Sequence, residues 1–108
     1  PTVDPDAEPT AAPAAWNMPI FSPEFYDSLR GFVRRIVRAT FEKIHRLCQD
    51  WRHPSLRAIP LEGLPEHFRI RIAMDIRLIY RPLDSGRLEI LSLIDRADLQ
   101  RYIRNARG

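Results

Sequence analysis

Four arginines interrupt an otherwise apolar run at residues 68–81, FRIRIAMDIRLIYR. Side chains on a strand alternate between its two faces, so Arg69 and Arg71 would share one face of a first strand. Arg77 and Arg81 would share one face of a second strand that follows a short turn. If the two strands pair in antiparallel register, all of these cations lie on one side of the sheet. Arginine stays protonated and presents a planar fork of donors, which suits it to binding phosphate.

An alternative is that this side of the sheet is simply charged and solvated. Exposed faces of antiparallel sheets do carry polar side chains. They usually mix signs, however, because like charges on neighbouring strands repel. The only acid in the run is Asp75, which falls in the expected turn. This concentration of positive charge favours an anionic partner, phosphate first, over a solvated face.

The charge distribution along the chain indicates the same kind of partner. The 108 residues carry a formal net charge of +3, but the first 17 hold three acids and no Lys or Arg. The remaining residues, 18–108, hold all 17 Lys or Arg against 11 Asp or Glu, a net charge of +6. Lys43 is the only lysine among them. A small domain with this excess of arginine fits an anionic partner, with nucleic acid first.

Several other kinds of protein and site are disfavoured. Cys48 stands alone, which excludes a disulfide framework and a cysteine metal cluster. His45, His53 and His67 lack the spacing of a metal pair, and we expect no metal and no cofactor. No segment has the length and apolarity of a membrane span, and no signal peptide opens the chain. We therefore expect a soluble protein of the cytoplasm.

The composition divides the chain into a tail and one domain. Residues 1–17, PTVDPDAEPTAAPAAWN, are rich in proline and alanine and offer little to bury. They are expected to be extended or disordered. They could be a tether to another domain or a cloning or processing remnant, and the start at Pro1 rather than a methionine fits either. Residues 18–108 are expected to form one domain.

A brief strand and a helical hairpin are predicted for the first half of this domain. Residues 16–21 are a short apolar run that ends at a turn signal. Ser22 can then cap a helix, and Pro23 suits its first turn. Apolar residues continue at helical spacing to about Asp50. Gly31, in the middle, marks a break, so we expect two helices rather than one rod.

Strands dominate the second half. Residues 51–66 form a proline-rich loop, with a short strand near residues 56–59. Three strands follow at residues 67–72, 76–82 and 87–94, the last two joined by a hairpin turn. Asp95 then caps a closing helix. The order β-α-α-β-β-β-α, with neighbouring strands antiparallel, predicts an α+β domain whose helices cover one face of a curved sheet and leave the arginines on the open face.

Two stretches carry a resemblance to a known family. LEGLPEHFRIRIAMDIRLIYR and, further on, LEILSLIDRADLQRYIRNA resemble the RelE/ParE superfamily of bacterial toxins. The shared features are a Leu-x-Gly turn, an aromatic-Arg-x-Arg strand, an Arg-Leu-hydrophobic-Tyr strand, and a last strand that leads through an arginine into a helix. The resemblance covers residues 18–108. It implies a RelE-like toxin of a type II toxin–antitoxin system, an endoribonuclease that cuts mRNA in the ribosomal A site and inhibits translation.

The resemblance also implies roles for individual residues. Arg69 and Arg71 match two basic residues of the first hairpin strand. Arg77 matches the arginine that holds the phosphate. Arg96 matches an arginine that stabilises the transition state or protonates the leaving oxygen, and Tyr102 matches a tyrosine that orients the substrate by stacking on a base. In such toxins the ribose 2′-hydroxyl is activated to attack the neighbouring phosphate.

The chain departs from the family's pattern at the general base. Arg71 occupies a position where the catalytic member has a lysine, and arginine is a poor base because it stays protonated. Glu62, Glu66 and His67, just before the strand, are candidate substitutes. Arg81 matches no functional position of the family and enters only as a member of the phosphate-binding face.

The resemblance leaves three functions open. The leading one is the RNA-cleaving toxin, whose partners would be mRNA on the ribosome and an antitoxin with an acidic or amphipathic segment. A ParE-like toxin that acts on DNA gyrase without cutting RNA is the second. The third is a RelE-like accessory domain, binding nucleic acid, that was excised from a larger protein such as a helicase.

Overall fold

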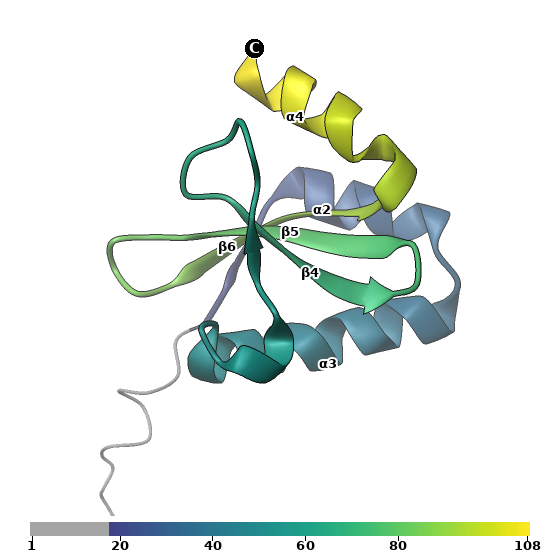
Figure 1. The fold of residues 1–108 in the computed structure, drawn as a ribbon. Coiled ribbons are helices and arrows are strands. Elements are labelled where there is room, and N and C mark those ends of the chain that lie inside the picture. Colours follow the sequence, from purple (N-terminus) through teal and green to yellow (C-terminus); the bar gives the residue numbers. More distant parts are fainter. Residues whose placement is uncertain (1–17) are drawn as a thin grey trace, which may run out of the picture.

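The computed structural model describes residues 18–108, so the tail expected over residues 1–17 lies outside the described residues. Along the chain it contains β2 (Ile20–Phe21), α2 (Pro23–Ser28), α3 (Arg34–Asp50), β3 (Ile59–Pro60), β4 (Phe68–Ala73), β5 (Ile76–Pro82), β6 (Leu88–Asp95) and α4 (Leu99–Arg107). The five strands form one sheet in the order β2-β6-β5-β4-β3. The predicted α+β class and order of elements are confirmed (Figure 1).

The helical hairpin begins and breaks where the sequence predicts. Ser22 is the N-cap of α2, and its Oγ accepts a hydrogen bond from the Phe25 backbone N–H at 3.1 Å. Pro23 occupies the first turn, where its missing N–H costs nothing. A 3-10 turn, Leu29–Gly31, then separates α2 from α3. None of the helices in the described part of the chain has the length and apolarity needed to cross a membrane.

The hairpin packs on one face of the sheet and forms the main core. Phe25, Ile44 and Leu47 of the helices meet the apolar side chains of the three long strands. Their strand partners include Ile70, Leu78, Tyr80, Leu88, Ile90 and Leu93. Tyr80 is fully buried, as its parity with Leu78 predicts. The alternation of strand side chains is therefore the feature that selects this face.

Two of the short strands differ from the prediction. β2 contains only Ile20–Phe21 and runs parallel to β6, whereas neighbouring strands were expected to be antiparallel. No hairpin turn joins β2 to β6, since α2, α3 and three strands lie between them in the chain, so nothing local imposes antiparallel pairing. The strand expected near residues 56–59 is shifted to Ile59–Pro60, because Leu56 ends a 3-10 turn at Pro54–Leu56.

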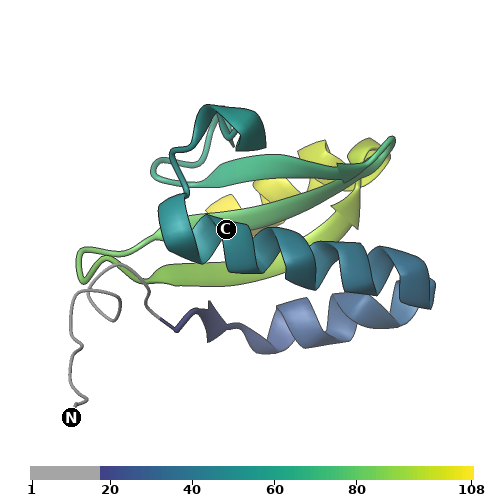
Figure 2. The same ribbon diagram turned by 90° about the horizontal axis from the view of Figure 1, so that it is seen from below.

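The expectation that the arginine face is open is wrong. A second, smaller core lies on this face, formed by Leu61, Leu64, Ile79 and Ile103. Ile79 projects from β5 between the arginines, and α4 brings Ile103 onto it. Figure 1 shows α3 and α4 on opposite sides of the sheet, and Figure 2 shows α4 behind the strands when α3 is in front. Helix α4 therefore divides the arginine face instead of leaving it free.

Candidate nucleic-acid interface

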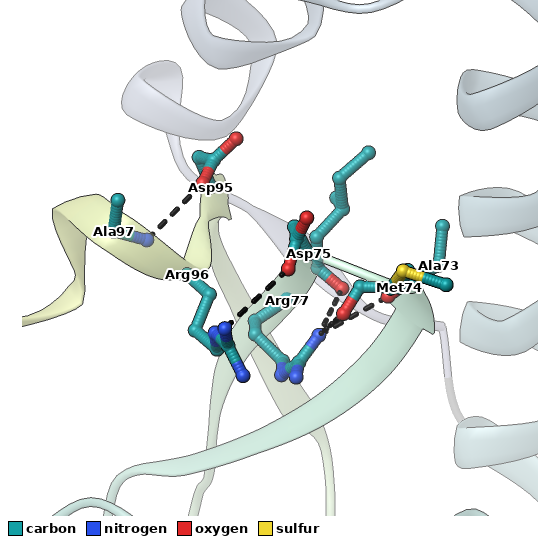
Figure 3. A network of polar contacts seen from close by, with 8 residues as sticks. Ala73, Met74, Asp75, Arg77, Asp95, Arg96 and Ala97 are labelled. Carbon is teal, nitrogen blue, oxygen red and sulfur yellow. Dashed lines mark hydrogen bonds and ion pairs between the residues drawn. The ribbon is translucent and has the colours of Figure 1, made fainter.

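Arg77 is held in place by the turn between β4 and β5. The residue is only 8% exposed. The Nη1 group donates to the carbonyl oxygens of Ala73, Met74 and Ile76 at 3.1, 3.0 and 3.2 Å (Figure 3). A register shift between Arg71 and Ala73 precedes this turn. Backbone acceptors therefore fix one end of the guanidinium, and its Nε and Nη2 make no hydrogen bond within residues 18–108.

Other arginines surround Arg77. Its pKa is lowered, first because burial disfavours the charged form, and then because Arg69, Arg71 and Arg96 repel it. Asp75 raises this pKa, and among residues 18–108 no other acid does so. We call Arg69, Arg71, Arg77 and Arg96 the arginine cluster. Its charges are close enough to perturb one another and lack a matching set of carboxylates, so the cluster is suited to an anion.

Strand register brings two members of the cluster face to face. Arg71 on β4 is the direct partner of Arg77 on β5. Arg69, two residues earlier, points to the same face and pairs with Ile79. Like charges at directly opposed positions destabilise a sheet. The arrangement therefore works against folding stability, which is the pattern expected of a binding site.

Arg96 joins the cluster from the end of β6. Its backbone N–H donates to the Asp75 carbonyl at 2.6 Å, and its Nη2 lies 3.7 Å from the Asp75 carboxylate. Asp95 caps the 3-10 turn Arg96–Asp98 by accepting from the Ala97 N–H at 3.1 Å, whereas it was expected to cap the closing helix, which begins at Leu99. These contacts tie the start of the last helical segment to the β4–β5 turn. They place the Arg96 and Arg77 side chains next to each other (Figure 3).

Arg81 lies at the other end of β5, and an acid partners it. Its Nη2 is 2.7 Å from Glu89 Oε1, and the two residues are direct partners across β5 and β6. Its Nε is buried without a hydrogen-bond partner in the described part of the chain. The structure thus separates Arg81 from the arginine cluster. Its predicted part in phosphate binding stays a prediction.

Tyr102 lies in the same cleft as Arg81, away from Arg77. It lines a cleft of about 440 Å³ together with Arg81 and Glu89. Burial raises the pKa of its hydroxyl to about 12, with further contributions from Glu24 and Glu89. The hydroxyl therefore stays protonated at neutral pH. Although Tyr102 follows Arg96 by only six residues, α4 carries it along the sheet to the opposite end of β5.

The candidate general bases are scattered. His67 lines the same cleft as Tyr102, and its Nδ1 donates to the Pro65 carbonyl at 2.8 Å, which leaves Nε2 as the acceptor in the neutral ring. It precedes β4 and lies four residues before Arg71, about 13 Å of extended chain. Glu62 is exposed, and Glu66 borders a different recess, beside Trp51. Neither glutamate is among the charges that act on Arg77.

Some residues of the site were not predicted from the sequence. The carbonyls that hold Arg77 come from Ala73, Met74 and Ile76, whose side chains give no signal of that role. Glu89 could have been found, because hairpin pairing of the strands places it opposite Arg81. Glu24 lies in the first turn of α2, where the helix dipole alone accounts for an acid, so its type gives no signal of a place in the site. Within residues 18–108 no group of three or more His, Cys, Asp or Glu is arranged to hold a metal ion.

Solved toxin structures share this fold. The RelB–RelE antitoxin–toxin complex from Methanococcus jannaschii matches with a TM-score of 0.64 at 14% identity, over 77% of this chain and 96% of that one. The toxin–antitoxin complex RelBE2 from Mycobacterium tuberculosis gives 0.56 at 28% identity, over 70% and 93%. A YoeB/ParE toxin from Agrobacterium tumefaciens gives 0.58 at 23% identity, over 72% and 98%.

Neither a protein-family model nor a curated protein matches the sequence. The structural matches nevertheless extend over about three quarters of this chain and nearly all of each toxin chain. The chain therefore has the RelE-like toxin fold, as the resemblance in its sequence implies.

Proposed function

We propose that this chain is the toxin of a type II toxin–antitoxin pair and that it cleaves mRNA on the ribosome. The observation that carries the proposal is the arginine cluster. Arg77 is fixed by three backbone carbonyls, while its Nε and Nη2 make no hydrogen bond in the described residues. Arg69, Arg71 and Arg96 surround it. A fixed guanidinium with further cations around it is suited to gripping one phosphate of an RNA strand.

The proposed reaction is an attack of the ribose 2′-hydroxyl on its neighbouring phosphate. The new bond joins the 2′-oxygen to phosphorus, and the bond from phosphorus to the 5′-oxygen of the next nucleotide breaks. The 2′-hydroxyl loses its proton to water and the departing 5′-oxygen takes one up from water, which leaves a 2′,3′-cyclic phosphate and a free 5′-hydroxyl. Negative charge builds on the phosphate oxygens and on the leaving oxygen during this step. Cations already fixed in position stabilise that charge without having to reorganise. In the proposal Arg77 binds the phosphate oxygens and Arg96 faces the leaving oxygen.

The arginine cluster contains no side chain that can act as the base for the 2′-hydroxyl. Arg71 cannot give up its proton at neutral pH. Tyr102 keeps its proton because its pKa is raised to about 12. His67 belongs to the cleft at the other end of β5. In the proposal, electrostatic stabilisation therefore supplies most of the rate, and the enzyme is slower than one with a base in the cluster.

The proposal is tested by mRNA cleavage on programmed ribosomes. The wild-type protein is expected to cut, and Arg77→Ala to lose most of the activity. Arg38→Ala is a matched control, because Arg38 is an exposed arginine on α3. If the wild type fails to cut, the proposal is wrong. A gyrase supercoiling assay with the same proteins then tests the ParE-like alternative, and inhibition without RNA cuts would support it.

The proposed partner is an antitoxin whose acidic or amphipathic segment covers the arginine cluster and α4. The matched proteins from M. jannaschii and M. tuberculosis were solved as toxin–antitoxin complexes. In this chain the cluster offers a concentration of positive charge, and an acidic segment would neutralise it.

A further inference from the structure

A second polar site lies on the same side of the sheet as the arginine cluster. It is the cleft of about 440 Å³ that contains Tyr102, and we call it the Tyr102 cleft. Its lining includes Glu24, His67, Arg81, Glu89, Leu91 and Tyr102, which come from α2, the start of β4, β5, β6 and α4. The volume falls within the range of small-molecule sites. The lining combines aromatic rings with hydrogen-bonding groups, which is the composition that binds bases of single-stranded RNA.

Two carboxylates distinguish this cleft from the arginine cluster. Glu89 is held by its ion pair with Arg81 at 2.7 Å. Glu24 lies in the first turn of α2, and its side chain forms no hydrogen bond or ion pair in the described residues. Both acids are close enough to Tyr102 to raise the pKa of its hydroxyl. The cleft therefore presents hydrogen-bond acceptors beside an aromatic ring.

We propose that the Tyr102 cleft binds a guanine base, stacked on Tyr102, whose N1–H and N2 amino groups donate to Glu24 and Glu89. Among the four RNA bases, only guanine presents two adjacent donors on its Watson–Crick edge. Adenine and cytosine present one amino group next to an acceptor, which a carboxylate repels. Uracil presents one donor between two acceptors.

This inference rests on the proposed function, because it supplies a base contact for the RNA whose phosphate the arginine cluster holds. Arg81 at the cleft is four residues from Arg77, about 13 Å along β5. Both residues face the α4 side of the sheet, with Ile79 between them. Helix α4 covers Ile79, so an RNA strand that connects the two sites would pass beside this helix, with a phosphate at Arg77 and a nearby base at Tyr102. The cluster would bind without regard to sequence, and the cleft would supply the preference.

The experiment measures binding of short RNAs that cannot be cleaved because every ribose is 2′-O-methylated. Four RNAs differ only at one base, and a fifth carries inosine, which is guanine without the N2 amino group. The wild type is expected to bind the guanine RNA about tenfold more tightly than the others, since one good pair of base hydrogen bonds discriminates by that order. Inosine is expected to lose part of this preference.

Glu24→Gln is the test variant, and Glu42→Gln, an exposed glutamate on α3, is its control. Glu24→Gln is expected to reduce the preference for guanine over inosine to less than about twofold. Its affinity for the other RNAs should stay unchanged, and the control should behave as the wild type. Equal binding of all five RNAs, absence of binding, or a preference that survives Glu24→Gln would overturn the inference. Because no cleavage is needed, a protein that binds guanine but cuts nothing would disprove only the proposed function.

Discussion

At the scale of single residues, the chain places arginine where the proposed chemistry benefits from a base. Arg71 lies directly opposite Arg77, so any group at its position is next to the proposed phosphate site. Arginine there adds charge but cannot accept a proton. A lysine in the same place would feel the repulsion of the other arginines, which lowers the pKa of an ammonium group.

Arg71→Lys is therefore expected to increase the rate of RNA cleavage. A positioned base contributes about 10²-fold or more at its best, and a gain of about tenfold is expected here because the lysine is only partly deprotonated. The gain should grow with pH, since the neutral amine is the active form. Single-turnover cleavage between pH 6 and 9 measures it. Arg69→Lys is the control, and an equal gain there or a loss at Arg71→Lys would contradict this account of the base.

The buried hydroxyl of Tyr80 lowers the stability of the folded protein. The residue is fully buried in the main core, and its hydroxyl has no hydrogen-bond partner in the described residues. Burial raises the pKa of this hydroxyl. Tyr80→Phe is expected to stabilise the protein by about 1 kcal/mol, because it removes an unsatisfied buried polar group. Denaturant unfolding measures the change. Tyr26→Phe is the control, since Tyr26 is 54% exposed, and a loss of stability in Tyr80→Phe would show that the hydroxyl has a partner.

At the scale of elements, α4 separates the arginine cluster from the Tyr102 cleft on the same face of the sheet. It is attached just before its start, where Arg96 bonds to the β4–β5 turn, and along its length through Ile103 in the small core. Ile103 packs with Leu61, Leu64 and Ile79 and lies apart from the main core. A helix with so few apolar contacts belongs to the less stable part of a domain. The start and the body of α4 should therefore respond differently to mutation.

Ile103→Ala is expected to release α4 from the sheet while the rest of the fold persists. Truncating a buried isoleucine costs about 2 kcal/mol or more, which is large relative to this small core. Hydrogen exchange should become faster at residues 99–107 and stay unchanged in α3. Arg104→Ala, on the exposed side of α4, serves as the control. If exchange in α3 rises together with that in α4, the small core is not a separate unit.

Much of this element structure is predictable from local patterns, and the docking of α4 is not. The Ser22–Pro23 start, the break at Gly31 and the strand alternation follow from short-range stereochemistry. The apolar side of α4 has to pack somewhere, but its sequence does not say on which face of the sheet. The sequence feature that could have indicated the face is Ile79, an apolar residue among the arginines. The resemblance implies that Tyr102 acts on the same substrate as Arg77 and Arg96, whereas α4 places it in a cleft with Arg81.

At the scale of the whole molecule, the proposed function makes the net charge the main determinant of affinity for RNA. Residues 18–108 carry a net charge of +6, and the arginine cluster concentrates part of it around one turn. Each phosphate that a protein neutralises on a single strand contributes about −0.7 to the slope of log K against log salt. The slope of log K against log salt therefore measures how many phosphates the domain contacts.

Arg77→Gln is expected to make this slope less steep by about 0.7, since one phosphate contact is lost. The measurement is the affinity for an uncleavable single-stranded RNA between about 50 and 200 mM salt. Arg81→Gln should change the slope less, because Arg81 already has Glu89 as its counterion. An equal change in the two variants would mean that the two ends of β5 bind phosphate alike.

The central claim is that the fixed guanidinium of Arg77 drives RNA cleavage, and Arg77→Lys tests it most directly. Lysine keeps the charge but loses the planar fork that bonds to the turn and to a phosphate together. Single-turnover cleavage of mRNA on programmed ribosomes should be easily measured in the wild type and fall about 10²-fold in Arg77→Lys, while the melting temperature shows both proteins folded. Wild-type activity in the variant, or no cleavage by the wild type, would contradict the account.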